Sequence, residues 1–394
     1  MLVADRDILG IDGARLDAAG AALTAREIAQ QPAVWPAIDA LVAQQRAALD
    51  DFLAPLLARP DLRIVLAGAG TSAFIGECLA PALLGAGWRA EAVPTTDLVS
   101  GPLRFLQPAV PTLLVSFGRS GSSPESVAAV ALANQLVPDV HHLVVTCNAD
   151  GELYRMAAGA PNAFALLLPD ATHDRAFAMT TSFTSMLLAT ALAFGVLPSG
   201  TGAAMAAPAS AVQQQALPQL QSLVAARFKR VVYLGSNALR ALAREAALKL
   251  LELTDGQVVA LFDSPLGFRH GPKTVVDGET LVVVLLSNDP HARRYDLDLL
   301  RELRGDARAG RVLALSGLPA PELGDDCVVP AGAQDADDLA LALPYIVFCQ
   351  SFALLQSLAL GLRPDTPSVS GTVNRVVRGV TIHPFTGGGH VPRG

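Results

Sequence analysis

Residues 63–72 have the sequence RIVLAGAGTS, and residues 230–239 have the sequence RVVYLGSNAL. Each segment begins with a short apolar run, typical of a buried parallel strand, and continues through a glycine turn into a helical stretch. The turn glycines Gly68 and Gly235 are 167 positions apart. Two further strand ends, near residues 116 and 148, have counterparts 171 and 168 positions downstream. The matching offsets predict two tandem copies of one α/β domain.

The domain boundaries follow from changes in composition. We expect a helical segment over residues 1–45, a first domain over 46–200 and a second domain over 219–384. Residues 201–218 are rich in Ala, Gln and Pro and carry no charge, which predicts a partly helical inter-domain linker. Residues 385–394 are expected to form a flexible tail.

Composition excludes several classes of protein. Of the 394 residues, 51% are hydrophobic and 16% are charged, so the chain is not disordered. The net charge of −7 disfavours a general nucleic-acid binder, which is usually basic. Lysine occurs only at positions 229, 249 and 273, which disfavours a polybasic membrane-binding patch.

Cysteines and apolar stretches bear on location. Cys78, Cys147, Cys327 and Cys349 are far apart and form no C-x-x-C pair, which argues against zinc binding and disulfides. No secretory signal is expected, and the reduced thiols predict a cytoplasmic protein. Residues 339–362 carry no charge and are long enough to span a membrane. Their polar residues favour a buried helix at a domain or subunit interface, with a membrane span as the alternative.

The turn at residues 68–73, GAGTSA, fits the dinucleotide-binding pattern G-x-G-x-x-G/A. Glu91, at the end of the next expected strand, lies where a ribose-binding acid would be found. An NAD-binding Rossmann domain is therefore one hypothesis, and a simple tight turn is another. If the turn binds any ligand, the backbone N–H groups at the start of the helix favour an anion.

A second motif, SFGRSGSSPE at residues 116–125, is more specific. It follows a strand and opens a helix, with Pro124 suited to the first helical turn. Serine hydroxyls, close backbone approach at glycine and the helix N-terminus all favour phosphate. No nucleotide P-loop pattern occurs in the chain. The alternative is a solvated serine-rich loop with a helix cap.

Two later segments contain polar side chains of chemical interest. Residues 179–185, MTTSFTS, supply hydroxyls that either contact a ligand or cap a helix. Glu245, Lys249 and Glu252 are spaced i, i+4 and i+7 on one helical face, either as a surface ion-pair stripe or as a partly buried general base. His270 follows in an irregular loop beside Gly271 and Pro272, where functional groups concentrate.

Together these motifs resemble the sugar isomerase (SIS) domain family over nearly the whole chain. Residues 264–273 and 370–377 resemble the bacterial tagatose-6-phosphate ketose/aldose isomerases, also described as galactosamine-6-phosphate deaminases. Residues 248–254 resemble the helix that carries the catalytic glutamate in the isomerase half of glucosamine-6-phosphate synthase. The resemblance implies two tandem SIS domains, each a three-layer α/β/α sandwich with a mainly parallel, flavodoxin-like sheet.

The same resemblance implies a hexose or hexosamine 6-phosphate as substrate, with no metal and no cofactor. Glu252 would move a proton between C2 and C1, and His270 would assist ring opening from the partner subunit of a homodimer. Lys249 would stabilise the developing oxyanion together with residues 180–181. Arg378 stands where the synthase has a lysine; because arginine does not readily lose a proton, the role expected for it is stabilisation of charge. The residues expected to bind substrate or its phosphate are Gly70, Thr71, Ser72, Arg119, Ser120, Ser122, Ser123, Thr180 and Thr181.

A catalytically silent SIS module that senses a sugar phosphate is the alternative function. The chain carries both Glu252 and His270 and shows no helix-turn-helix extension, which favours the enzyme. The Rossmann hypothesis leaves the serine-rich loop unexplained.

Overall fold

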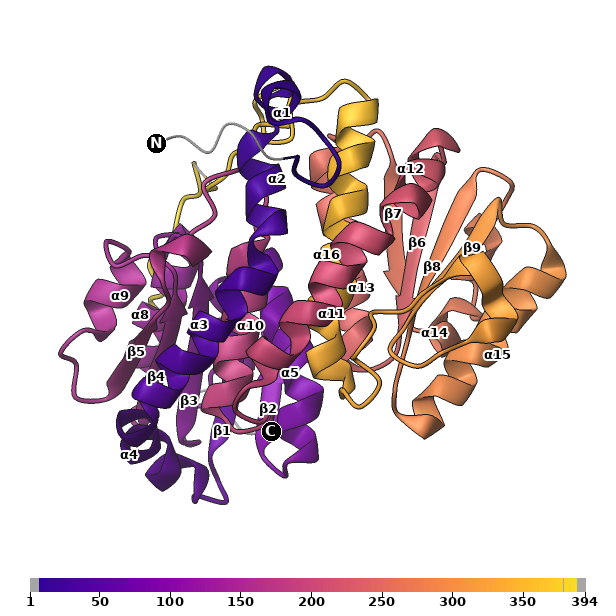
Figure 1. Cartoon of the computed structure of the whole chain (residues 1–394). Helices are drawn as coiled ribbons and strands as arrows, with labels where there is room; N and C mark the ends of the chain where they lie inside the picture. The colour runs from indigo at the N-terminus through magenta and orange to yellow at the C-terminus, as the bar shows by residue number, and fades with distance from the viewer. Residues whose placement is uncertain (1–6, 378, 388–394) are drawn as a thin grey trace.

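Two five-stranded parallel sheets organise the structure, a computed structural model that describes residues 7–377 and 379–387 (Figure 1). The first sheet has the strand order β2-β1-β3-β4-β5, and the second has the order β7-β6-β8-β9-β10. Both follow the flavodoxin-like order 2-1-3-4-5, which confirms the tandem α/β prediction. The strands are β1 (Arg63–Ala67), β2 (Arg89–Ala92), β3 (Thr112–Gly118), β4 (Val140–Thr146), β5 (Ala163–Leu167), β6 (Arg230–Gly235), β7 (Val259–Asp263), β8 (Thr280–Leu286), β9 (Arg311–Ser316) and β10 (Cys327–Val328).

Helices connect successive strands and cover both faces of each sheet (Figure 1). Those before and within the first domain are α1 (Gly13–Ala19), α2 (Ala22–Ala29), α3 (Gln31–Gln44), α4 (Arg46–Leu57), α5 (Thr71–Gly85), α6 (Thr95–Ser100), α7 (Pro102–Phe105), α8 (Pro124–Leu136), α9 (Glu152–Ala157) and α10 (Thr181–Ala193). Those that follow are α11 (Thr201–Gln215), α12 (Leu217–Ala225), α13 (Ala238–Leu253), α14 (Pro265–Phe268), α15 (Pro290–Asp306) and α16 (Asp338–Ala359). Short 3-10 helices lie at Asp170–Thr172, Pro272–Val275 and Pro321–Asp326.

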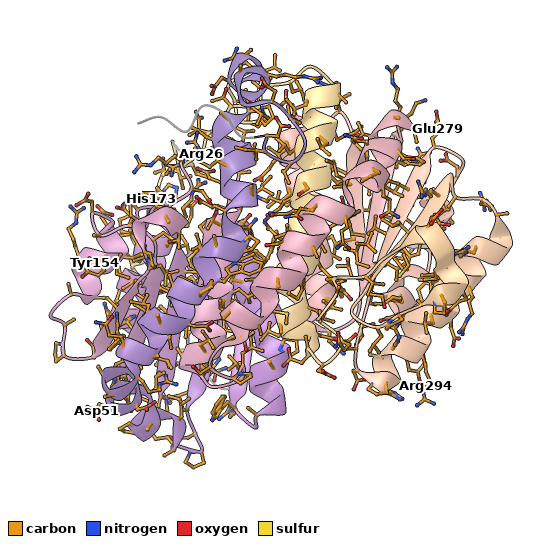
Figure 2. All side chains as sticks on the ribbon, in the orientation of Figure 1. Arg26, Asp51, Tyr154, His173, Glu279 and Arg294 are labelled. Atoms are coloured by element: carbon orange, nitrogen blue, oxygen red, sulfur yellow. The ribbon has the colours of Figure 1, made fainter. Side chains whose placement is uncertain are left out.

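Alternate strand residues face two different cores. In β1, Ile64 and Leu66 belong to a large cluster between the two sheets, whereas Val65 and Ala67 belong to a smaller cluster on the outer face. β6 repeats this alternation across its own sheet. Apolar side chains fill these layers, while charged ones such as Glu279 lie at the periphery (Figure 2). One core therefore joins the two domains.

The uncharged stretch at 339–362 forms α16, which packs against α11 and α13 between the two sheets. Its length and apolar composition would allow a membrane span, but 89% of its most apolar 18-residue stretch is buried within this chain. Burial on all sides explains why the helix is apolar all round. The prediction of a buried helix at a domain interface is confirmed.

The expected linker at 201–218 is more ordered than its composition indicated. It forms α11 and the start of α12, and α11 packs against α3 and α16. Met205, Ala209 and Val212 are buried in the shared core. The connection between the domains is therefore helical, and one face of α11 is part of the shared core.

The end of the chain returns to the first domain, which corrects the boundary placed at residue 384. Asp365 accepts hydrogen bonds from the backbone N–H and the hydroxyl of Thr24, at 2.8 and 2.7 Å. Farther on, the carbonyl of Phe385 accepts from Gln135 Nε2 at 3.1 Å, and the Phe385 ring packs on the outer cluster of the first sheet. Phe385, the first residue of the expected flexible tail, is thus in contact with the fold, and residues 388–394 lie outside the described part.

Candidate active site

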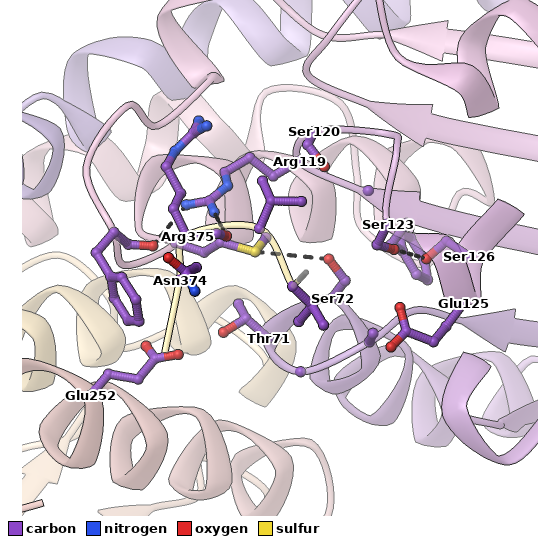
Figure 3. Close-up of a pocket in the computed structure, with 18 of the residues that line it drawn as sticks. Thr71, Ser72, Arg119, Ser120, Ser123, Glu125, Ser126, Glu252, Asn374 and Arg375 are labelled. Carbon is purple, nitrogen blue, oxygen red and sulfur yellow. Dashed lines mark hydrogen bonds between the residues drawn. The ribbon is translucent and has the colours of Figure 1, made fainter. Parts of the chain in front are cut away.

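A cavity of about 210 Å³ lies at the carboxyl ends of β1 and β3. Here the connections leave the sheet in opposite directions, which is where open α/β sheets bind ligands. The N-termini of α5 and α8 border the cavity, α13 closes one end, and residues 373–377 cover it (Figure 3). The lining residues are Ala69, Gly70, Thr71, Ser72, Phe117, Gly118, Arg119, Ser120, Ser123, Glu125, Ser126, Phe177, Met179, Lys249, Glu252, Val373, Asn374, Arg375, Val376 and Val377.

The turn at residues 68–72 is shaped by two glycines. A Cβ on Gly68 would lie 2.5 Å from the backbone carbon of Ser72, so only glycine fits the turn. Gly70 has φ +56°, and its counterpart Asn237 has φ +51°, so both domains use the same turn. Glu91, the ribose-binding acid of the NAD hypothesis, is ion-paired with Arg63. The turn therefore presents the start of α5 to the cavity, while the carboxylate that would bind the ribose of a dinucleotide is engaged by Arg63.

The serine-rich loop at residues 118–123 is held from below. Thr146 Oγ1 donates to the carbonyl of Gly118 at 2.7 Å, and Asn148 Nδ2 donates to the carbonyl of Ser120 at 2.8 Å. Ser120 and Ser123 line the cavity, and Ser123 is the N-cap residue of α8. With these carbonyls turned toward the fold, hydroxyls and a helix N-terminus face the cavity, as an anion requires.

Ser122 is not placed as predicted. Its side chain is exposed, and its Oγ accepts from the backbone N–H of Glu152 at 3.2 Å. It does not line the cavity in the described structure. The hydroxyl is thus directed to the start of α9 rather than into the cavity.

Three ionisable residues on one face of α13 form the other end of the cavity. Lys249 Nζ contacts the carboxylate of Glu252, lies 3.5 Å from Glu245 Oε1 and donates to Thr71 Oγ1 at 2.9 Å. Glu245 and Lys249 are buried, whereas the side chain of Glu252 is 24% exposed and reaches the cavity. The interpretation as a partly buried site, rather than a surface stripe, is supported.

Burial sets the charges of this group. Desolvation raises the pKa of Glu245 to about 8, against the attraction of Lys249. Burial also opposes the ammonium form of Lys249, but Glu245 and Glu252 outweigh it and raise the pKa of that lysine. At neutral pH, Glu245 is therefore protonated and Lys249 is charged.

Relatives of known name match this chain over most of its length. A family model for the SIS domain matches residues 56–195. The chain is 50% identical over 372 residues to D-galactosamine-6-phosphate deaminase AgaS of Escherichia coli, covering 92% of this chain and 96% of that protein. The chain belongs to the SIS domain family, in its AgaS group. A protein of the same name from Shewanella sp. (strain ANA-3) is 45% identical over 381 residues, or 93% of each chain. The crystal structure of tagatose-6-phosphate ketose/aldose isomerase from Escherichia coli aligns with a TM-score of 0.84 and 46% identity, over 92% of this chain and 97% of that one.

The hydroxyl run of this SIS chain is not directed into the cavity as predicted. Asp174, which is fully buried, accepts from the backbone N–H groups of Thr180, Thr181 and Ser182 at 2.7–3.1 Å. The Thr180 hydroxyl also donates to Asp174, and that of Thr181 donates to the carbonyl of Glu27. Asp174 thus takes the place of an anion at the N-terminus of α10. Met179, one residue earlier, lines the cavity instead.

Two predicted catalytic residues lie apart from the cavity or outside the described residues. His270 is exposed in the loop between α14 and the 3-10 helix Pro272–Val275, and it does not line the cavity of its own chain. That His270 reaches the cavity of a second subunit therefore stays a prediction. Arg378 lies outside the described residues.

Several residues at the site were missed. Asn374 and Arg375 line the cavity, and the phrase at residues 370–377 that carried the resemblance was the available signal. Glu27 does not line the cavity but lies behind it: it accepts from the backbone N–H groups of Arg175 and Ala176, and burial followed by repulsion from Asp174 raises its pKa to about 7. No sequence pattern linked Glu27 to Asp174, because they are 147 positions apart. Among residues 7–377 and 379–387, no group of His, Cys, Asp and Glu is arranged to hold a metal ion.

Proposed function

We propose that this chain is a phosphosugar aldose–ketose isomerase that deaminates galactosamine 6-phosphate to tagatose 6-phosphate and ammonia. The carrying observation is one cavity with an anion-binding end, at the starts of α5 and α8, and an acid–base end at Lys249 and Glu252. The AgaS relatives, 45–50% identical over more than nine-tenths of the chain, have the proposed activity in their names.

The phosphate end of the substrate would rest on Ser72, Ser120, Ser123 and the backbone N–H groups of Gly70 and Thr71. Ser72 and Ser120 line the cavity beside the N-termini of α5, a helix of 15 residues, and α8, a helix of 13 residues. The helix dipoles add partial positive charge there. Binding at this remote group would position the reacting carbons near Glu252.

At the other end, Glu252 would remove the proton from C2 of the open-chain amino sugar and return a proton to C1 through an enolamine. The product is a ketimine at C2. Water adds to that carbon and ammonia leaves, which gives the ketose phosphate. Lys249, charged and buried, would stabilise negative charge on the C1 oxygen as it develops. These steps use proton transfer and water alone.

Ring opening is assigned to His270 of a second subunit in a homodimer. Exposed apolar side chains lie next to both partners of that contact: Leu251 precedes Glu252 and is 42% exposed, and Leu266 near His270 is 49% exposed. We expect an isologous interface to pair these apolar side chains across the twofold axis, with His270 beside the cavity of the partner subunit.

A cytoplasmic location is part of the proposal. Among the described residues, which include Cys78, Cys147, Cys327 and Cys349, the cysteines are free. Burial raises the pKa of Cys147 to about 12, so that thiol is inert. Unpaired thiols fit a reducing compartment.

The test is release of ammonia and tagatose 6-phosphate from galactosamine 6-phosphate, with glucosamine 6-phosphate in parallel. Glu252→Gln keeps the side-chain size but cannot accept a proton, so we expect its rate to fall by about 10²–10⁴-fold. Glu279→Gln, at an exposed glutamate of the second domain, serves as the matched control and should retain wild-type activity.

Binding of both amino sugar phosphates without turnover would contradict the proposed enzyme activity and support the alternative, a catalytically silent module that senses a sugar phosphate. Turnover of tagatose 6-phosphate without ammonia release from either amino sugar would instead support a plain isomerase. Full activity of Glu252→Gln would remove Glu252 from the mechanism.

A further inference from the structure

Residues 373–377, the roof segment, cover the cavity without being buried themselves (Figure 3). Val373 is 58% exposed and Val377 is 51% exposed. The segment has no helix or strand structure. Its position therefore depends on a small number of polar contacts rather than on apolar burial.

Those contacts converge on two arginines. Arg119 donates through one terminal nitrogen to the carbonyl of Arg375 at 2.7 Å, and through the other to the carbonyls of Ala176 and Phe177 at 3.3 and 3.0 Å. Arg375 donates through Nε to the carbonyl of Ala176 at 3.2 Å and through a terminal nitrogen to that of Asp174. Arg119 thus joins the serine-rich loop, residues 176–177 and the roof segment.

A second cavity lies behind the roof segment. It has a volume of about 410 Å³, and its walls include Val373, Asn374, Arg375 and Val376, which also line the active-site cavity. The roof segment is therefore a single layer of chain between two cavities. If the roof segment moved away from the active-site cavity, it would enter the second cavity rather than a packed core.

Arg119 connects the serine-rich loop to the roof segment through its backbone and its side chain. It lies between Gly118 and Ser120, so its backbone belongs to the loop that would hold the phosphate, while its side chain is 5% exposed and turned to the roof. Both terminal nitrogens are already bonded to carbonyl groups. The guanidinium is charged at neutral pH, since burial and then the neighbouring Arg375 lower its pKa only to about 10.

We propose that Arg119 is a positioning residue that couples phosphate binding on the loop to closure of the roof segment, rather than a ligand of the phosphate. This inference rests on the proposed sugar-phosphate site. Ordering the loop by an anion fixes the Arg119 backbone, and the Arg119 side chain transmits that order to the carbonyl of Arg375. The competing role is direct binding of the anion by Arg119 Nε, which is buried and has no partner among the described residues.

The test measures hydrogen–deuterium exchange of peptides covering residues 370–377, with and without inorganic phosphate and galactosamine 6-phosphate, beside calorimetric binding. In the wild type, we expect either ligand to slow exchange of the roof segment by about fivefold or more. Arg119→Met should bind the ligands within about tenfold of wild type and lose that protection, because the methionine side chain has no N–H group to donate to the carbonyls. Arg175→Met removes an exposed arginine beside the same carbonyls and should behave as wild type.

Two further variants guard against a folding defect. Arg119→Lys keeps the charge and can reach one carbonyl, so it should retain part of the protection. Arg375→Gln removes the contacts to the carbonyls of Asp174 and Ala176 but leaves the carbonyl at position 375 for Arg119. It should speed roof exchange without ligand and keep ligand-dependent protection.

Wild-type protection in Arg119→Met would overturn the coupling. A loss of binding greater than about tenfold, with roof exchange unchanged, would make Arg119 a phosphate ligand. Both readouts use inorganic phosphate as well as the sugar, so they stand apart from turnover. A chain that binds phosphate and orders its roof, yet releases no ammonia, would contradict the proposed deamination and leave this inference intact.

Discussion

Glu245 shows how a single buried carboxyl group is adapted to its surroundings. It is fully buried on α13, and neither of its oxygens accepts a hydrogen bond from the described residues. The ammonium of Lys249, 3.5 Å away, is also held by Glu252 and Thr71. One positive charge between two carboxyl groups favours keeping a proton on the more buried one.

The first prediction concerns the pH dependence of stability. Folded Glu245 keeps its proton up to about pH 8, whereas an unfolded glutamate releases it near 4.5, so folding binds a proton between these values. Stability therefore falls as pH rises through that window, by at most about 1.4 kcal/mol per pH unit from this residue. Glu245→Gln removes this contribution. The variant should therefore become more stable relative to wild type, with a larger free energy of unfolding, as the pH rises from 5 to 8.

Urea unfolding at each pH measures this difference. Glu279→Gln, at an exposed position, should differ from wild type by the same amount at every pH. A constant offset between Glu245→Gln and wild type would show that Glu245 ionises normally in the folded chain.

Helix α16 shows the same dependence on surroundings at the scale of an element. Its sequence fits a membrane span as well as a core helix. α11, α12 and α13 pack around it, and a membrane is not needed to cover its apolar sides. Phe348, near its middle, is 1% exposed in the core that joins the two sheets.

We predict that Phe348→Ala lowers the free energy of unfolding by about 3–5 kcal/mol, because the cavity left between the domains cannot collapse completely. Urea denaturation at fixed protein concentration checks the value. Leu360→Ala, at the 37% exposed C-terminal end of the same helix, is the control and should change stability by less than about 0.5 kcal/mol. An equally small effect for Phe348→Ala would mean that α16 is loosely packed.

At the scale of the whole molecule, the two domains are copies with different roles. The turn at Gly70 is repeated at Asn237, yet the matching edge of the second sheet is filled by its own carboxylates. Asp296 accepts from the Ser236 hydroxyl and the Ser287 N–H, and Asp338 accepts from the Ser287 hydroxyl and the Asn288 N–H. These negative charges exclude a phosphate there. The first domain supplies the anion site, and the second supplies α13.

The proposed dimer gives a prediction at this scale. Glu252→Gln and His270→Ala should each be inactive alone. If His270 acts in the partner's site, refolding an equal mixture restores one complete site in each mixed dimer, or roughly a quarter of wild-type activity by statistical pairing. Ammonia release from the mixture measures it. If His270 served the cavity of its own chain, every site in the mixture would lack one residue and no activity would return.

The repeated strand-and-turn segments were enough to predict the tandem α/β fold, because buried parallel strands and glycine turns have local signatures. The same local logic located Ser120, Ser123, Lys249 and Glu252, which the tertiary structure brings to one cavity. It misplaced the hydroxyls of residues 122, 180 and 181, because the direction of a hydroxyl depends on which distant group is nearest. The Thr180 hydroxyl donates to Asp174 and the Thr181 hydroxyl donates to the carbonyl of Glu27, and no local sequence pattern indicates either contact.

Local spacing along the chain therefore determined which elements form and which helix ends can bind an anion. The tertiary structure alone decided that one face of residues 201–218 is buried in the core, that residues 373–377 roof the cavity and that Arg119 reaches them. Each of these depends on contacts between segments far apart in sequence. Their energies come from burial and from pairing of polar groups in three dimensions, which no short stretch of sequence contains.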